Sequence, residues 1–198
     1  MTSALREHFG NPRNVGSVDS PEAESRAGSV TCGAVLVLTL RIDEVQKVVA
    51  ARFKAAGCSR LVAACSLLTE QAEGMTTGEA AVLAQTPTKV EDKLGASPQG
   101  QEHCVALAGE ALLAAIWKYS DSVRADWSGD DPLICTCFGV SEETIERTVR
   151  DAALNTVAEV TRACNAGAGC RSCHPIIQDI LDELSDKLQF VEGASDWS

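Results

Sequence analysis

A β-strand is predicted by Val35-Leu-Val-Leu-Thr-Leu-Arg-Ile42, a run of apolar and β-branched residues. The turn Asp43-Glu44 follows, and residues 45–54 predict a second strand that pairs with the first as a hairpin. After Cys58 the apolar residues recur every three or four positions, which is typical of a helix. Since the hairpin and the helices occupy separate stretches, the first half of the chain is predicted to be an α+β domain.

Two helices of this half flank a polar stretch. The first opens at Cys58 behind Gly57, and the second opens at Cys104 behind His103. Between them, residues 70–102 are variable and polar, and we predict no element there. A short helical segment also opens the chain. The predicted apolar faces comprise Leu61, Val62, Cys65 and Leu68 in the first helix and Leu107, Ala111, Leu112, Ala115 and Ile116 in the second.

The second half of the chain is predicted to be a small all-α domain without strands. Ser141, followed by two glutamates, has the pattern of a helix N-terminus, because its hydroxyl caps free amides and the acids face the positive end of the helix dipole. Asn155-Thr156 predicts another helix start, and Pro175 fits a first helical turn. The last helix is predicted to bury the stripe Ile176, Ile177, Ile180, Leu181, Leu184 and Leu188.

Two close pairs of thiols stand in this second half, Cys135-Thr-Cys137 and Cys170-Arg-Ser-Cys173, separated by 32 residues. Four soft thiolates suit an iron–sulfur cluster or zinc. Glycines in residues 165–169 and at Gly139 let the backbone approach a bulky cluster and offer amide hydrogens to its sulfurs. Two structural disulfides are the competing interpretation of the same four cysteines.

Composition and charge exclude several classes of function. The chain of 198 residues is 45% apolar, enough for a packed core, and its net charge of −11 argues against nucleic acid and anionic membranes as partners. The longest apolar stretch, residues 30–40, is too short to span a bilayer, and charged residues at positions 6 and 7 argue against a signal peptide. Nine cysteines without such a signal indicate metal or thiol chemistry in the cytoplasm.

A linker is predicted around residues 126–132, where Asp126-Trp-Ser-Gly-Asp-Asp-Pro132 is polar and marked by glycine and proline. The predicted organisation is a domain over residues 1–125, a linker over 126–133, a helical domain over 134–189 and a tail over 190–198.

Three further cysteines, Cys32, Cys58 and Cys104, stand at the ends of predicted elements in the first half. Scattered thiols are usually ordinary core residues. Loops and helix starts, however, are where sites are built, and a helix start lowers the pKa of a thiol and favours the thiolate that binds metal. These three cysteines are therefore candidate ligands.

Several motifs resemble known families. Residues 11–16 (Asn-Pro-Arg-Asn-Val-Gly), Thr31-Cys-Gly33, residues 51–58 and His103-Cys104 resemble the IscU-type iron–sulfur scaffold. In the second half, residues 135–140 and Gly169-Cys-Arg-Ser-Cys-His-Pro175 resemble bacterioferritin-associated ferredoxin. The combination, in this order, is similar to the NifU family of modular scaffolds, which is associated with nitrogenase maturation.

The resemblance implies a non-enzymatic scaffold with two centres. It implies a transient iron–sulfur cluster on Cys32, Cys58 and Cys104, and a permanent [2Fe–2S] cluster on four ligands, namely Cys135, Cys137, Cys170 and Cys173. Three thiolates leave the coordination incomplete, which suits assembly and release, whereas four close the shell. His103 either completes the transient site or lies beside it. The resemblance also implies a cysteine desulfurase and apo iron–sulfur proteins as partners, and a homodimer.

Three departures from the family pattern stand out. Ala34 occupies the position of an aspartate, in a site that we expect to be partly exposed, and this loss of a carboxylate predicts slower cluster release. Residues 97–101 replace the segment on which a dedicated chaperone docks in the family. Since no cysteine follows Cys173, the third domain of NifU, which has its own Cys-x-x-Cys, is expected to be missing.

The remaining candidates have ordinary interpretations. We expect Cys65 to be a buried apolar residue and Cys164 to be a non-ligand near the permanent cluster. Arg13 and Arg60 are expected to be solvated, with Arg60 two residues from a proposed ligand. His8 is expected on the surface and His174 in a loop.

Two alternative functions remain open from the sequence. In one, the protein is a [2Fe–2S] electron carrier or redox sensor whose first half is a decayed scaffold. In the other, it is a zinc-binding interaction module, since four cysteines also suit zinc.

Overall fold

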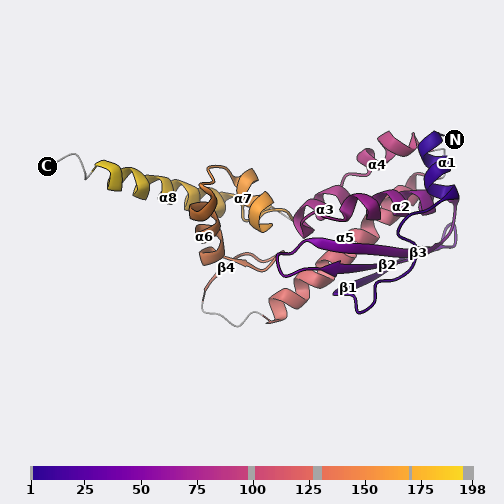
Figure 1. The fold of residues 1–198 in the computed structure, drawn as a ribbon, viewed down its shortest axis with the longest axis horizontal. Helices are drawn as coiled ribbons and strands as arrows, with labels where there is room; N and C mark the ends of the chain where they lie inside the picture. Colours follow the sequence, from indigo (N-terminus) through magenta and orange to yellow (C-terminus); the bar gives the residue numbers. More distant parts are fainter. Residues whose placement is uncertain (1, 98–100, 127–130, 170, 194–198) are drawn as a thin grey trace. The chain divides into compact units, whose positions relative to one another are not determined.

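The structure is a computed structural model that describes residues 2–97, 101–126, 131–169 and 171–193, with side chains described except at 102, 126 and 186–193. It divides into two compact units, Met1–Tyr119 and Ser120–Ser198. Figure 1 shows a sheet with helices in the first unit and mainly helices in the second. The α+β fold class and the helical character of the second half are thus confirmed.

The first unit is built on an antiparallel sheet in the order β1-β2-β3, formed by Ala23–Ser29, Ala34–Ile42 and Val48–Ala56. The predicted hairpin is confirmed as β2 and β3, with Leu38 opposite Phe53. The buried face of the sheet carries large apolar side chains at every second position of β2, namely Leu36, Leu38 and Leu40.

Strand β1 was not predicted, because its residues Ala-Glu-Ser-Arg-Ala-Gly-Ser lack the β-branched and aromatic side chains that favour strands. It forms by pairing with β2 along its whole length. The buried Ser25 hydroxyl in this strand donates a hydrogen bond of 2.7 Å to the Ala111 carbonyl of helix α5 (Glu102–Asp126). Tertiary contacts therefore outweigh a weak local preference here.

The helices of the first unit include two in the stretch for which none was expected. A capping box joins Thr76 and Glu79 at the start of one, and Pro87 occupies the first turn of the other. Those local signals predict both helices once they are recognised. The helices are α1 (Ser3–Gly10), α2 (Ser59–Ala72), α3 (Thr77–Ala84), α4 (Pro87–Leu94) and α5 (Glu102–Asp126).

The second unit contains a short two-stranded ladder, which corrects the expectation of a domain without strands. Strands β4 (Leu133–Cys135) and β5 (Val140–Ser141) pair across the turn that carries Cys137. Strands this short have no readable alternation, so the sequence did not predict them. The helices are α6 (Glu142–Ala152), α7 (Val157–Cys164) and α8 (His174–Gly193).

The predicted helix starts of the second unit are confirmed. The Ser141 hydroxyl accepts a hydrogen bond from the Thr144 amide, and Thr156 forms a capping box with Glu159. In the predicted stripe of α8, Ile177, Ile180, Leu181 and Leu184 are buried, whereas Ile176 is exposed and the Leu188 side chain lies outside the described residues.

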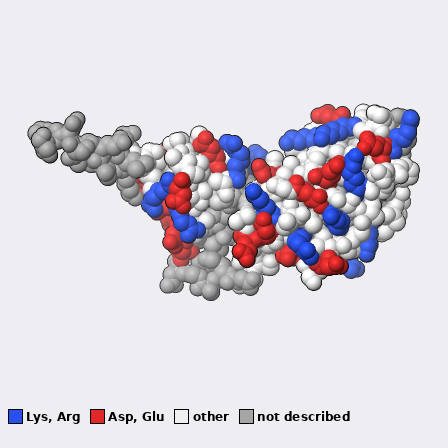
Figure 2. Space-filling view, viewed as in Figure 1, with Lys and Arg blue, Asp and Glu red and all other residues white. Residues whose placement is uncertain are grey.

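Residues 127–130 of the predicted linker over 126–133 lie outside the described residues, and the linker stays a prediction. None of the described helices is long and apolar enough to cross a membrane. On the face shown in Figure 2, acidic and basic side chains are interspersed.

Candidate metal centres

Three separate elements of the first unit bring sulfur and nitrogen donors together. Cys32 lies in the turn between β1 and β2, Cys58 is the N-cap of α2, and His103 and Cys104 lie in the first turn of α5. The Cys58 side chain accepts no capping hydrogen bond from its own helix. Its thiol instead contacts the thiol of Cys104.

The distances join these side chains into one cluster. The Sγ atoms of Cys58 and Cys104 are 2.9 Å apart. The Nε2 atom of His103 lies 3.0 Å from the Sγ of Cys32 and 3.7 Å from the Sγ of Cys104. His103 therefore bridges the exposed Cys32 thiol to the buried Cys104 thiol.

The thiols of this cluster differ in their readiness to ionise. Hydrogen bonds from the Ser29 side chain, from His103 and from the Ala34 backbone lower the pKa of the exposed Cys32 thiol to about 7. Burial, followed by the hydrogen bond with Cys58, raises the pKa of the Cys104 thiol to about 12. The exposed Cys32 thiol thus ionises near neutral pH, whereas the buried Cys104 thiol stays protonated there.

The donor set suits a soft metal, but its present contacts are hydrogen bonds. Among the described residues, no three His, Cys, Asp or Glu side chains are arranged to hold a metal ion. Two thiolates on one tetrahedral metal, with metal–sulfur bonds of about 2.3 Å, lie about 3.8 Å apart. The 2.9 Å between Cys58 and Cys104 must therefore lengthen before both bind one metal.

Ala34 follows Cys32 by two residues and is not partly exposed as expected, since only 2% of its surface is accessible. A Cβ added at Gly57 would meet the Cβ of Ala34 at 3.2 Å and a methyl of Leu61 at 2.9 Å. The chain beside Cys58 thus packs directly on Ala34. An aspartate at position 34 would have to be buried or would displace this backbone.

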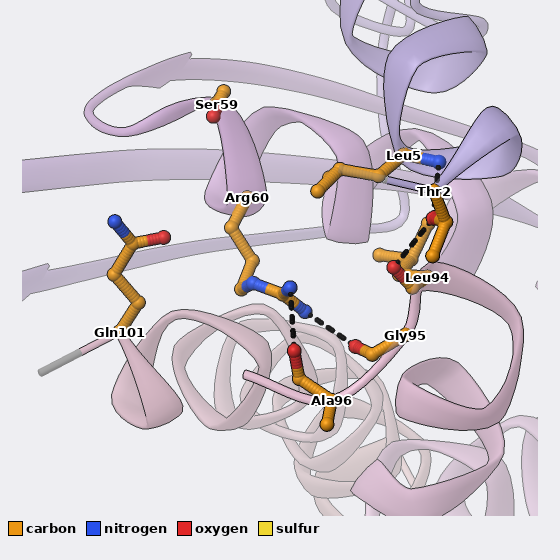
Figure 3. A pocket seen from close by; sticks show the side chains of 8 residues that line it. All are labelled: Thr2, Leu5, Ser59, Arg60, Leu94, Gly95, Ala96 and Gln101. Atoms are coloured by element: carbon orange, nitrogen blue, oxygen red, sulfur yellow. Dashed lines mark hydrogen bonds between the residues drawn. The ribbon is translucent and has the colours of Figure 1, made fainter. Parts of the chain in front are cut away.

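Arg60 is buried rather than solvated, with 3% of its surface accessible. Figure 3 shows its guanidinium turned towards the segment after α4. It donates hydrogen bonds of 2.8 Å and 2.9 Å to the carbonyl oxygens of Gly95 and Ala96. Its positive charge lowers the pKa of the Cys104 thiol, although burial of that thiol dominates.

The expectation for His8 is also wrong, because its ring is buried and its Nδ1 lies 2.9 Å from the Ser66 hydroxyl of α2. Burial, followed by the charge of Arg13, lowers its pKa. Arg13 is partly exposed and pairs with Glu7 and Glu70. This network ties α1 to α2.

In the second unit, the described candidate ligands lie at the end of β4 (Cys135), in the following turn (Cys137) and just before α8 (Cys173). Cys170 lies outside the described residues. The Gly167 amide donates to the Cys135 sulfur over 3.5 Å, as expected for an amide that faces a cluster ligand. His174 is the first residue of α8 and does not lie in a loop as expected. Its Nε2 lies 3.0 Å from the Gly167 carbonyl and supports that loop, a role that the sequence did not reveal.

Gly169 has a steric reason to be glycine. A Cβ there would lie 3.0 Å from the Cβ and 3.2 Å from the Sγ of Cys137. Backbone therefore passes directly beside this thiol, as it must where loops enclose a bulky cluster.

No disulfide joins any of the eight described cysteines. Cys65 is buried as predicted, and burial raises its pKa. Cys164 ends α7, where its thiol donates to the Val160 carbonyl over 3.3 Å and burial raises its pKa.

Comparison with known proteins matches both halves of the chain. Residues 2–126 match the family described as NifU-like N terminal domain, and residues 133–183 match the BFD-like [2Fe-2S] binding domain. A nitrogen fixation protein NifU from a Nostoc species is 36% identical over 194 residues, which cover 93% of this chain and 64% of that protein. The chain thus spans less than two thirds of the length of this relative.

The first unit has further relatives. The iron-sulfur cluster assembly enzyme IscU of Drosophila melanogaster is 40% identical over 116 residues, which cover 57% of this chain and 73% of that protein. A crystal structure of a nitrogen-fixing NifU-like protein (N-terminal) from Brucella abortus has the same fold, with a TM-score of 0.51 at 17% identity over 61% of this chain and 94% of that one. The resemblance inferred from the cysteine motifs is confirmed, and the chain belongs to the family with a NifU-like N-terminal domain.

Proposed function

We propose that this protein is a scaffold on which iron–sulfur clusters are assembled and from which they pass to apo-proteins. The observation that carries the proposal is the convergence of Cys32, Cys58, His103 and Cys104 from three element ends into one contact cluster. Relatives of the first unit are named for this task, among them the iron-sulfur cluster assembly scaffold protein IscU 1 of Archaeoglobus fulgidus.

The residues of the first site have different roles when a cluster is assembled. Cys32 is exposed and ionises near neutral pH, so its Sγ is the first ligand to meet incoming iron or sulfur. Cys58 and Cys104 follow as they separate from each other. The Nε2 of His103 donates a hydrogen bond to the Cys32 sulfur and lies 3.7 Å from the Cys104 Sγ, so the imidazole holds these two ligands close together. Because one ligand stays exposed, the assembled cluster remains open to an acceptor.

The second unit is proposed to hold a resident [2Fe–2S] cluster on Cys135, Cys137, Cys170 and Cys173. The amide of Gly167 and the close approach of Gly169 support this assignment. When bound, that cluster supplies one-electron redox chemistry. Two of its proposed ligands, Cys135 and Cys173, are buried, so the cluster would be shielded from solvent on their side.

A cysteine desulfurase is the proposed source of sulfur, and apo iron–sulfur proteins are the proposed recipients. The names of the NifU relatives place nitrogen fixation among the proposed contexts. We further propose a homodimer in the cytoplasm.

Reconstitution tests the scaffold function. The protein as isolated, with its resident cluster, is incubated anaerobically with iron and either sulfide or a desulfurase with cysteine, and its added iron and acid-labile sulfide are counted. The variant with Cys32, Cys58 and Cys104 all changed to Ser is expected to keep the resident cluster and gain nothing. Cys65→Ala is the matched control, because it removes a buried thiol from α2 without removing a proposed ligand.

Equal uptake by the triple variant and the native protein would contradict the proposal. Transfer of the added cluster to an apo-ferredoxin then separates a scaffold from an electron carrier. A colourless protein that contains zinc as isolated would instead support an interaction module.

A further inference from the structure

Arg60 is a buried cation beside the first site. It is the second residue of α2, two positions after Cys58, and 3% of its surface is accessible. Among the described residues no carboxylate forms an ion pair with it. Charged side chains this deeply buried are normally paired, because removing a charge from water is costly.

The immediate partners of Arg60 leave its charge uncompensated. Two of its nitrogens donate to the carbonyl oxygens of Gly95 and Ala96, which are dipoles without net charge. Its Nε is buried without a hydrogen-bond partner. A cavity of about 300 Å³ lies against the side chain, and none of its described lining residues is acidic (Figure 3). They are Thr2, Leu5, Ser59, Arg60, Leu94, Gly95, Ala96 and Gln101.

Arg60 contacts both chain segments that lead to proposed ligands, namely the start of α2 and residues 95–96. Its own helix begins at Cys58, and the carbonyls that it holds precede the stretch that leads to His103 and Cys104. The start of α2 adds the positive end of a helix dipole to the same region. A thiolate-ligated [2Fe–2S] core is an anion, since three or more thiolates outnumber the two positive charges of the oxidised core.

We propose that Arg60 is the counter-charge of the labile cluster, a positioning residue that stabilises the loaded site and is uncompensated in the empty one. The inference rests on the proposed scaffold function and deepens it, because it says what regulates retention at that site. Removal of the charge then has opposite effects on the two states. The loaded site is weakened, and the empty protein loses an unfavourable buried charge.

The test uses the full chain with its resident cluster and two substitutions. Arg60→Gln removes the charge but keeps an N–H donor for one carbonyl oxygen. Arg60→Lys keeps the charge but loses the planar guanidinium that donates to both Gly95 and Ala96. Arg41→Gln is the matched control: Arg41 is exposed, its guanidinium also donates to a backbone carbonyl, and it lies at the far end of β2 from Ala34.

The cluster half-life is expected to depend on whether position 60 carries a positive charge. Two unit charges separated by on the order of 10 Å, at an effective dielectric of about 20, interact strongly enough to change an equilibrium roughly tenfold. The half-life of the reconstituted cluster under a chelator is therefore expected to fall about tenfold in Arg60→Gln and to stay near the native value in Arg60→Lys and Arg41→Gln. The thermal midpoint of Arg60→Gln with the labile site empty is expected to be unchanged or higher.

Three outcomes overturn the proposal. One is an equal cluster half-life in the native protein and all the variants. Another is an equal fall of the half-life in Arg60→Gln and Arg60→Lys, which assigns the effect to the two hydrogen bonds of the guanidinium and not to its charge. The third is unfolding of empty Arg60→Gln, which makes Arg60 a structural residue.

A second probe separates this inference from the scaffold function. Calorimetric titration with Zn²⁺ reports the thiol site directly, once the signal that persists in the Cys32, Cys58 and Cys104 triple variant is subtracted. Severalfold weaker Zn²⁺ binding in Arg60→Gln supports the counter-charge even where the native protein gains no cluster. Unchanged Zn²⁺ binding together with unchanged cluster half-life excludes it.

Discussion

The two thiol sites of this molecule are built in different ways. Cys32, Cys58 and Cys104 come from three distant element ends, and the outermost of them is exposed. The described candidate ligands of the second unit stand in a strand end and two turns, beside a loop whose Gly167 amide faces a sulfur. The first site depends on the packing of a whole domain, whereas the second is held by short loops.

This difference suits two proposed fates for a cluster. An exposed ligand near the surface lets an acceptor attack, and the contacting thiols of Cys58 and Cys104 must separate before both bind one metal. Loops that enclose a cluster and donate amides to its ligands favour retention.

Cys137→Ser is expected to abolish the visible absorption of the protein as isolated. The substitution removes one of four proposed thiolates from the enclosed site, at a thiol against which Gly169 packs. Iron content and the visible spectrum of anaerobically purified protein measure the effect. Cys164→Ser, at the end of α7, is the control and keeps its colour. Full colour in Cys137→Ser would break the assignment of the resident cluster.

Alkylation of the protein with an empty first site should separate Cys32 from Cys104. The iodoacetamide reaction of Cys32 is expected to rise with pH around a midpoint near 7, because only the thiolate reacts and hydrogen bonds from Ser29 and His103 lower its pKa to about 7. Cys104 has a raised pKa of about 12 and is buried, so it stays unlabelled below pH 9. Peptide mass spectrometry measures both.

Ser29→Ala provides the control for that experiment. Loss of the hydrogen bond that contributes most to the lowered pKa of Cys32 is expected to move its labelling midpoint to higher pH. Equal labelling of Cys32 and Cys104 would contradict the description of one exposed thiolate beside a buried thiol.

Ala34→Asp is expected to destabilise the first unit. The residue is buried against Gly57, and a buried carboxylate without a partner lowers the free energy of unfolding by about 1–3 kcal/mol. The carboxylate also repels neighbouring thiolates, so the labile cluster should be lost faster under a chelator. Denaturant unfolding measures the loss of stability, and the half-life under a chelator measures the loss of the cluster. Ala34→Ser is the control that adds a polar group without a charge. An unchanged half-life would show that position 34 does not set retention.

Gly169→Ala is expected to have the smallest effect. The added methyl lies 3.0 Å from the Cβ of Cys137, so the thiol must shift by a few tenths of an ångström. Overpacking of this kind costs about 1–3 kcal/mol, and the resident cluster should be lost severalfold faster under a chelator. Gly10→Ala, where a Cβ meets nothing within 4 Å, serves as the control. Equal cluster half-lives in Gly169→Ala and the native protein would mean that the loop accommodates the added methyl without disturbing Cys137.

Local patterns in the sequence predicted much of this fold. The alternating run of β2, the capping residues Ser141 and Thr156, and the helix start at Cys58 are each decided by neighbours a few positions away. Helices α3 and α4 carry equally local signals in Thr76, Glu79 and Pro87, which the polar composition of that stretch obscured. The paired spacing of the second-unit cysteines is local as well, and it indicated a metal site without any fold.

The sequence by itself thus determined which donors the protein offers and where the regular elements of both units begin. Tertiary structure alone decided that β1 forms, that Ala34 and Arg60 are buried, and that His103 links Cys32 to Cys104. Strand β1 pairs with residues 5 to 17 positions away, and the other features join elements that are separate in the sequence. Periodicity and spacing carry information only over a few residues. The charge environment of the first site is therefore a property of the folded chain.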